Sequence, residues 1–211
     1  QKYLLAEKEK TTAELKLLKS QINPHFFFNV LSALQTLMFE KKNEQAIDYV
    51  SGFSILMRKV LEESNKEKAS LEEEIEFLKG YLTLEKLSLD FEYEIKIEPE
   101  DLEVEDILVP TMLLQPFVEN AIEHGLRKSN APERKLTVSF LEVDQHNLQV
   151  SVRDNGAGRN KKQRKNHVSR ALEITEDRQK LLKNSFNYKI IDHKDENDNA
   201  LGTEAVFMIK I

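Results

Sequence analysis

The chain has 211 residues, of which 40% are hydrophobic and 32% are charged, a balance that is typical of a folded globular protein. Asp and Glu outnumber Lys and Arg by 37 to 31, so the chain lacks the basic excess that nucleic-acid binding requires. The absence of cysteine excludes disulfide bonds and thiolate zinc sites. The longest apolar run, around residues 107–114, is far shorter than the roughly 20 residues that cross a bilayer.

The first third of the sequence predicts two long amphipathic helices. Residues 2–22 favour helix, and Pro24 is expected to kink this helix without ending it, because helical spacing resumes through Met38. A polar turn at residues 40–43 precedes a second helix at about 44–63. Such a hairpin leaves apolar faces exposed, which predicts a homodimeric four-helix bundle. The expected seam residues are Leu15, Leu18, Ile22, Ile47, Val50, Phe53 and Met57.

The rest of the chain predicts an α+β domain that has a mixed sheet with helices on one face. We place the boundary between residues 1–68 and 69–211. A capping box from Ser70 to Glu73 predicts an entry helix at 71–89, and Pro110 is expected to open a helix that ends near Gly125. The other expected elements are strands at about 91–97, 136–143, 148–152, 187–192 and 204–211, a basic loop at 159–166 and a helix at 171–184.

Residues 21–29 read QINPHFFFN, with His25 directly after the helical proline. Asn29 follows four residues later and therefore lies on the same helix face. An exposed imidazole is a nucleophile at neutral pH, because its unperturbed pKa is about 6.5. A partly buried histidine in a helix pair is the alternative, and this segment alone leaves both interpretations open.

Residues 114–125 read LQPFVENAIEHG, and they place polar groups on an otherwise apolar helix. These polar residues are Glu119, Asn120, Glu123 and His124. An amide together with carboxylate oxygens suits Mg²⁺, which is a hard cation. An amphipathic helix with a solvated face explains this segment equally well.

Residues 152–158 read VRDNGAG, so that Asp154 ends a strand. Gly156 and Gly158 allow the backbone to approach a ligand closely. The carboxylate can accept a hydrogen bond from an exocyclic amine such as that of adenine. A hairpin turn is the alternative, although a basic loop follows here in place of a pairing strand.

These three segments, together with Gly202-Thr203, resemble the sensor histidine kinases of the LytS-like class, from residue 21 to residue 211. The resemblance implies an ATP-binding lobe of the GHKL type behind a dimerising hairpin, with ATP and Mg²⁺ as cofactors. It implies that His25 accepts the γ-phosphoryl group and that Asn120 holds Mg²⁺. Asp154 would recognise the adenine amino group. The remaining residues assigned to catalysis or nucleotide binding are Asn29, Glu119, His124, Gly156, Gly158, Ser169, Arg170 and Thr203.

The resemblance further implies a two-component sensor kinase that phosphorylates itself on His25 and then passes the group to an aspartate of a response regulator. We expect the chain to be the cytoplasmic portion of an inner-membrane-anchored protein, with a membrane or sensor segment upstream, and we expect no nucleic-acid partner. The alternative is a non-catalytic dimeric signalling scaffold, a pseudokinase with a degenerate ATP lid. A GHKL ATPase or chaperone-like module would have no use for the hairpin that carries His25.

The sequence departs from the family pattern at two places. Where relatives carry a G-x-G-L box, residues 166–172 read NHVSRAL without a glycine, which predicts weak ATP affinity or altered turnover. The phosphates are then expected on the helix N-terminus, assisted by Ser169 and Arg170. Glu123 stands where relatives often have a lysine. A carboxylate there would repel phosphates unless it helps to bind the metal.

Overall fold

The structure is a computed structural model that describes residues 24–63, 66, 68–159 and 188–211, with the side chains of Pro24 and His25 also left out. The chain divides into two compact units, residues 1–67 and 68–211, and each is described by itself. This division falls one residue before the predicted domain boundary, which lies between residues 68 and 69. That the two parts are separate domains stays a prediction. The predicted helices at 2–22 and 171–184, and the loop beyond Arg159, lie outside the described residues.

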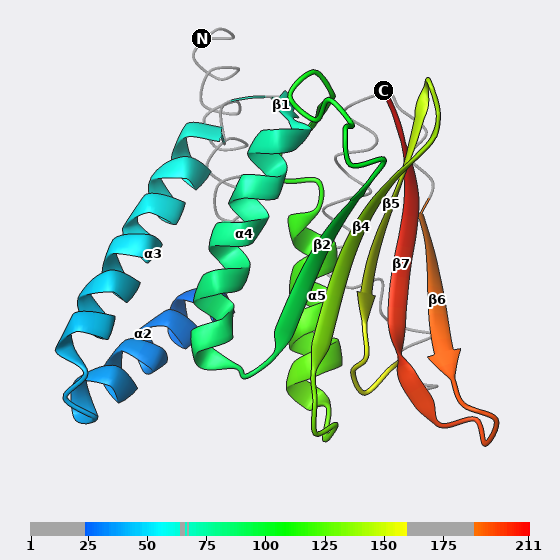
Figure 1. The fold of residues 1–211 in the computed structure, drawn as a ribbon. Helices are drawn as coiled ribbons and strands as arrows, with labels where there is room; N and C mark the ends of the chain where they lie inside the picture. The colour runs from blue at the N-terminus through cyan, green and yellow to red at the C-terminus, as the bar shows by residue number, and fades with distance from the viewer. Residues whose placement is uncertain (1–23, 64–65, 67, 160–187) are drawn as a thin grey trace, which may run out of the picture. The chain divides into compact units, whose positions relative to one another are not determined.

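The first unit contains a helical hairpin, formed by α2 (Pro24–Phe39) and α3 (Asn43–Glu63) (Figure 1). Lys41 takes a left-handed backbone conformation (φ 58°) in the turn. The N–H of Lys42 donates to the carbonyl of Leu37 (2.9 Å), and the N–H of Lys41 donates to that of Met38 (3.1 Å). This is the hydrogen-bond pattern of a Schellman turn, which ends a helix and reverses the chain.

Two apolar stripes run along the hairpin, and only one of them is buried. The buried stripe consists of Phe26, Val30, Ala33, Leu37, Ala46, Tyr49, Leu56 and Val60. The ring of Phe53 lies 5.4 Å from that of Phe27 and 6.1 Å from that of Phe26, so Phe53 packs inside the hairpin. These contacts do not test its predicted place in the dimer seam, which stays a prediction. The second stripe is exposed and consists of Phe28, Leu31, Met38, Ile47, Val50 and Leu61.

The second unit places α4 (Leu71–Ser88) and α5 (Gln115–Asn120) on one face of a five-stranded sheet (Figure 1). The strand order is β2-β4-β5-β7-β6, with β2 and β4 parallel and the other neighbours antiparallel. The mixed sheet with helices on one face confirms the predicted fold class, an α+β domain of the GHKL type. The strands are β2 (Glu92–Glu98), β4 (Lys135–Asp144), β5 (Asn147–Asp154), β6 (Tyr188–Lys194) and β7 (Ala200–Lys210).

The core of this unit lies between the helices and the inner face of the sheet. Alternate residues of β4 and β5 point inward, as the period of two predicts. Each such side chain contributes roughly 1.5–3 kcal/mol through its burial. The most deeply buried side chains include Phe77, Leu78, Tyr81, Leu82, Leu114, Ile122, Leu136, Phe140 and Phe207.

The predicted capping box at the start of α4 is confirmed. The N–H of Glu73 donates to the hydroxyl oxygen of Ser70 (3.1 Å), and the N–H of Ser70 donates to the Glu73 carboxylate (2.9 Å). Two of the free donors at the helix start are thereby satisfied. In the part of the chain that the structure describes, no helix is both long enough and apolar enough to span a bilayer.

The expectation that Pro110 opens a helix is wrong. Pro110 ends β3 (Leu108–Pro110), which pairs antiparallel with β1 (Lys68–Ser70), where a missing N–H is tolerated. The chain then turns at Met112, which has a positive φ of 56° and donates its N–H to the buried carboxylate of Glu74. The helix begins only at Gln115, with Pro116 in its first turn. Both prolines suit a helix start, and the second one takes that role.

The helical backbone continues beyond α5 through a π-turn, η1 (Ala121–Gly125), and a 3₁₀ turn, η2 (Leu126–Lys128). The predicted end near Gly125 is therefore three residues early. The wider turn of a π-helix rotates the following residues relative to an α-helix. Gly125 is consequently placed against the end of β5, as described below.

Candidate nucleotide site

Asp154 lies at the end of β5 and is only 2% exposed. The N–H of Gly156 donates to its Oδ1 (2.8 Å), and the hydroxyl of Thr203, its register partner on β7, donates to its Oδ2. Burial raises the pKa of the Asp154 carboxyl group, and the hydrogen bonds from Thr203 and Gly156 oppose that shift. Each carboxylate oxygen thus has one fixed donor, and its remaining lone pair has a defined direction.

Glycines surround this carboxylate at positions where a side chain would collide. A Cβ on Gly125 would lie 2.4 Å from Oδ1 of Asp154, and a Cβ on Gly156 would lie 2.2 Å from the carbonyl carbon of Gly125. Gly202 has a φ of +117°, and a Cβ there would lie 1.9 Å from the backbone oxygen of Asp154. The three glycines come from η1, from the turn after β5 and from β7. We call them the glycine cradle.

The turn after β5 is fastened to three other parts of the unit. Asn155 accepts the N–H of Lys135 (2.7 Å) and donates to the carbonyl of Glu133 (2.9 Å), which ties it to the start of β4. The N–H of Ala157 donates to the carbonyl of Gly125 (3.1 Å). Both edges of β5 are already paired, one with β4 and the other with β7, and neither strand follows directly from this turn. The alternative of a simple hairpin turn is therefore excluded.

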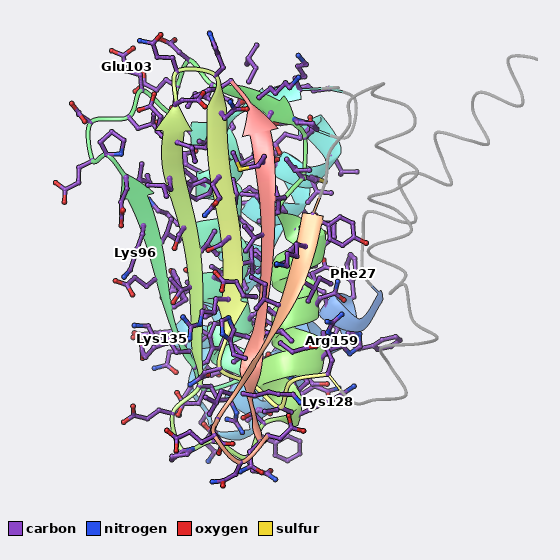
Figure 2. All side chains as sticks on the ribbon, turned by 90° about the vertical axis from the view of Figure 1, so that its right-hand side faces the viewer. Phe27, Lys96, Glu103, Lys128, Lys135 and Arg159 are labelled. Atoms are coloured by element: carbon purple, nitrogen blue, oxygen red, sulfur yellow. The ribbon has the colours of Figure 1, made fainter. Side chains whose placement is uncertain are left out.

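Arg159 provides the third attachment. Its Nε and Nη2 bind the two carboxylate oxygens of Asp192 on β6, at 2.7 and 3.0 Å. Figure 2 shows Arg159 beside this strand. Asp192 is the register partner of Thr203, so the pair lies next to the carboxylate site. The sequence predicted a basic loop from Arg159 onward, and it gave no signal for this partner.

The helical segment that ends at Gly125 carries the predicted metal-site residues. Asn120 and Glu119 are half-buried, and the side chain of Gln115 donates to Oε1 of Glu119 (2.7 Å). His124 is exposed, with its Nδ1 3.3 Å from Nζ of Lys128. Gly125, at the end of this segment, packs against Asp154 at the end of β5. Among the described residues, no group of three His, Cys, Asp or Glu side chains is placed to hold a metal ion.

Mg²⁺ would fit this arrangement through a single protein ligand. It usually keeps several waters and binds through one or two protein oxygens together with phosphates, so a single amide oxygen at Asn120 is sufficient. Glu123 does not add a second ligand, since its carboxylate binds Nε of Arg127 (3.1 Å). The glycine cradle allows the backbones of these three segments to pack directly around Asp154. Of the predicted residues, Gly156 and Thr203 both donate hydrogen bonds to Asp154. Asn120 lies on the helical segment that leads to Gly125.

Other predicted residues lie elsewhere. His25 and Asn29 are about one turn apart on α2, in the first unit, and Asn29 is half-buried. Gly158 has a φ of +66° and lies close to Ala200, so it shapes the end of the turn. Ser169 and Arg170 lie outside the described residues. The sequence named Gly125 only as a helix end, and its contact with Asp154 was missed.

Residues 13–92 match the family model described as histidine kinase. Together with the sequence relative that follows, this match shows that the chain belongs to the histidine kinase family. Within it, the chain is similar to the sensor histidine kinase/phosphatase LytS of Staphylococcus aureus (strain Mu50), with 32% identity over 146 residues. The match covers 69% of this chain but only 24% of LytS, so the chain spans about a quarter of the curated relatives' length. The resemblance predicted from the motifs is confirmed.

The chain is also similar to two solved structures. The mycobacterial sensor histidine kinase MprB has 14% identity and a TM-score of 0.48, and the match covers 68% of this chain and 96% of that one. The histidine kinase domain of the blue-light-activated kinase EL346 from Erythrobacter litoralis has 12% identity and a TM-score of 0.49. That match covers 94% of this chain and 95% of that one.

Proposed function

We propose that the chain is the kinase portion of a two-component sensor, which uses ATP to phosphorylate His25 and then passes the phosphoryl group to an aspartate of a response regulator. The observation that carries this proposal is the buried Asp154 carboxylate in its glycine cradle. The Asp154 site would bind ATP, and the segment PHFFFN contains the histidine that would accept the phosphoryl group. The chain would thus bring together the donor and the acceptor of a histidine kinase reaction. Family membership supports a kinase of this general kind.

The two hydrogen-bond donors that contact Asp154 support its proposed role in adenine recognition. Gly156 and Thr203 each occupy one oxygen, and a lone pair remains for the exocyclic amino group of adenine. A charge-assisted hydrogen bond of this kind contributes roughly 1.5–3 kcal/mol. Thr203 would also lie near the base, in contact through a water, and Gly158 would allow the backbone to approach the nucleotide.

The phosphates would extend from this base site toward the helical segment that carries Asn120. Its amide oxygen would hold Mg²⁺, with the exposed His124 beside the nucleotide. When bound, Mg²⁺ supplies charge neutralisation on the phosphates. We assign Ser169 and Arg170 to the phosphate contacts, where cations and a helix N-terminus would replace the missing lid glycines.

In the transfer step, a ring nitrogen of His25 forms a bond to the γ-phosphorus while the bond between that phosphorus and the ADP oxygen breaks. The imidazole proton leaves to a base, for which Glu119 is our candidate, because Gln115 fixes its carboxylate. Asn29, one turn from His25, would orient the ring. Catalysis of this kind rests mainly on positioning and charge neutralisation.

The hairpin would bring two chains together as a homodimer. Its second apolar stripe is well exposed, with Phe28 at 67%, Ile47 at 65% and Leu31 at 53%. Soluble monomers rarely expose a contiguous apolar patch of this kind, and pairing with a second hairpin would bury it in a four-helix bundle. We propose a parallel dimer through residues of about 10–62, with both His25 rings outside the bundle core.

The remaining partners are part of the same proposal. The response regulator would dock near His25 on the hairpin. The chain would be the cytoplasmic portion of an inner-membrane-anchored sensor, with its input segment upstream. The whole protein's signal would act through that segment.

A non-catalytic dimeric scaffold is the second candidate, and the absence of glycine from residues 166–172 favours it. Incubation of the chain with γ-labelled ATP and Mg²⁺ separates the two. A kinase gives an acid-labile, base-stable label on the wild-type chain and none on His25→Ala. A wild-type chain that binds ATP but takes up no label supports the scaffold.

A further inference from the structure

Arg127 binds two carboxylates that come from different parts of the second unit. Its Nη2 lies 2.9 Å from Oε2 of Glu85 on α4, and its Nε lies 3.1 Å from Oε1 of Glu123, one turn earlier in η1. The side chains of Glu85 and Glu123 are 1% and 16% exposed, and that of Arg127 is 26% exposed. A planar guanidinium is suited to such sharing, since it presents donors in several directions.

Several acidic side chains lie around the Glu85 carboxylate that Arg127 binds. Tyr81 donates its hydroxyl to Oε1 of Glu85 (3.4 Å), and Ser88 donates to Oε2 (3.2 Å). Burial, followed by the nearby carboxylates of Glu119, Glu85 and Glu123, raises the pKa of Tyr81 well above its ordinary value. Three carboxylates therefore lie around one buried phenol, and Arg127 contacts two of them.

The position of Glu123 makes this charge balance relevant to the nucleotide. Glu123 follows Asn120 by three residues, about one helical turn. Unpaired, its carboxylate would repel the phosphates of a nucleotide bound at Asn120. Between partly exposed charges several ångströms apart, such repulsion corresponds to a loss of about threefold to tenfold in affinity.

On this basis, and resting on the proposed function, we propose that Arg127 is a positioning residue for nucleotide phosphates. It turns Glu123 toward α4 and neutralises it, so that a carboxylate is tolerated next to the metal site. Glu85 takes part because its buried carboxylate anchors the other edge of the guanidinium. Arg127 thus compensates for the negative charge of Glu123.

The alternative is that Arg127 only fastens α4 to the segment after α5. The two roles differ in what restores binding after Arg127 is removed. If the role is charge neutralisation, removing the charge of Glu123 restores nucleotide binding. If the role is purely structural, the same change restores nothing.

The test measures MgADP binding to the full chain by calorimetry. The double variant Glu85→Gln/Arg127→Gln removes the cation without leaving a buried unpaired carboxylate, and it should bind MgADP about threefold to tenfold more weakly than wild type. Adding Glu123→Gln should return the affinity to within about twofold of wild type. Glu123→Gln alone should leave it unchanged within the same margin.

Adenosine serves as the matched probe, since it reports on the Asp154 site but carries no phosphate. Its binding, measured by NMR titration, should be equal in wild type and in the double variant. Arg127→Lys keeps a cation in place without a change at a buried position, so it should retain MgADP affinity within about twofold. If the double variant does not fold, the MgADP affinity of Arg127→Lys still tests the inference.

Several results would overturn the inference. These are equal MgADP affinity in wild type and the double variant, a triple variant that stays weak, a parallel loss of adenosine binding, or a loss in Arg127→Lys as large as in the double variant. A wild-type chain that binds neither MgADP nor adenosine would instead overturn the proposed function, and this inference with it.

Discussion

The two units of the chain differ in how they satisfy their own surfaces. In the second unit, the buried polar groups of the site have internal partners, as Asp154 has in Gly156 and Thr203. In the first unit, one apolar stripe is buried while the other remains exposed. The proposed nucleotide site is thus built by contacts within one unit, whereas the proposed dimer would cover the exposed stripe of the hairpin with a second chain. Substitutions in the second unit should therefore change nucleotide binding and phosphorylation, whereas substitutions in the first unit should change dimerisation.

The largest expected effect belongs to Asn120, in the second unit. Asn120→Ala should abolish Mg²⁺-dependent phosphorylation of His25, because it removes the proposed metal ligand. Since the side chain is only half-buried, the thermal unfolding midpoint should change little. Labelling with γ-labelled ATP and Mg²⁺ measures the effect. Unchanged labelling of the variant would contradict the metal assignment.

The second effect concerns the exposed stripe of the hairpin. Leu31→Lys/Ile47→Lys should weaken the proposed dimer by about 100-fold or more, because burial of each side chain contributes roughly 1.5–3 kcal/mol. Light scattering at tens of micromolar protein should give the mass of one chain, 24.5 kDa, for the variant and twice that mass for wild type. Ser32→Lys, at an exposed polar position on the same helix, is the matched control and should remain a dimer. A wild-type chain with the mass of a monomer would contradict the proposed dimer.

A smaller effect is expected at Asp154. Asp154→Asn should weaken ATP about tenfold to a hundredfold, because an amide has one acceptor oxygen and loses the charge-assisted hydrogen bond. The dimer should be unaffected, since Asp154 lies in the other unit. Calorimetry measures the first quantity and light scattering the second. Equal ATP affinity in variant and wild type would show that the carboxylate does not recognise the base.

The sequence predicted features that depend on local pattern and missed those that depend on distant contacts. Alternation in β4 and β5 and the capping box of α4 are local, and the structure contains them. The strands β1 and β3 have three residues each, too few for any periodicity. Pro110 and Pro116 both satisfy the local rule for a helix start, and only the buried Glu74, which holds the turn at Met112, distinguishes them.

The same division applies within the site. Asp154, Gly156 and Thr203 were identified from short motifs, and they lie together because β5 and β7 pair in this register. Gly125 was missed because its contact with Asp154 joins residues 29 positions apart. The pair of Glu123 and Arg127 has a local signal, since oppositely charged residues four apart on a helix attract each other. Its link to Glu85, 42 residues away, has none.

The smallest expected effect is the pH dependence that Asp154 gives to the second unit. Because burial raises its pKa above the ordinary 3.8, the native state holds this proton at pH values where the unfolded chain has released it. The contribution of this group to stability is therefore most favourable below the unfolded pKa, and it is lost as the pH rises through the folded pKa. ATP binding should change in the opposite direction, because the adenine amino group requires the ionised carboxylate. Thermal unfolding of wild type and Asp154→Asn from pH 3.5 upward, with ATP calorimetry where the protein stays folded, measures both. Identical pH profiles for the two proteins would show that this carboxyl group does not titrate in the range where the site acts.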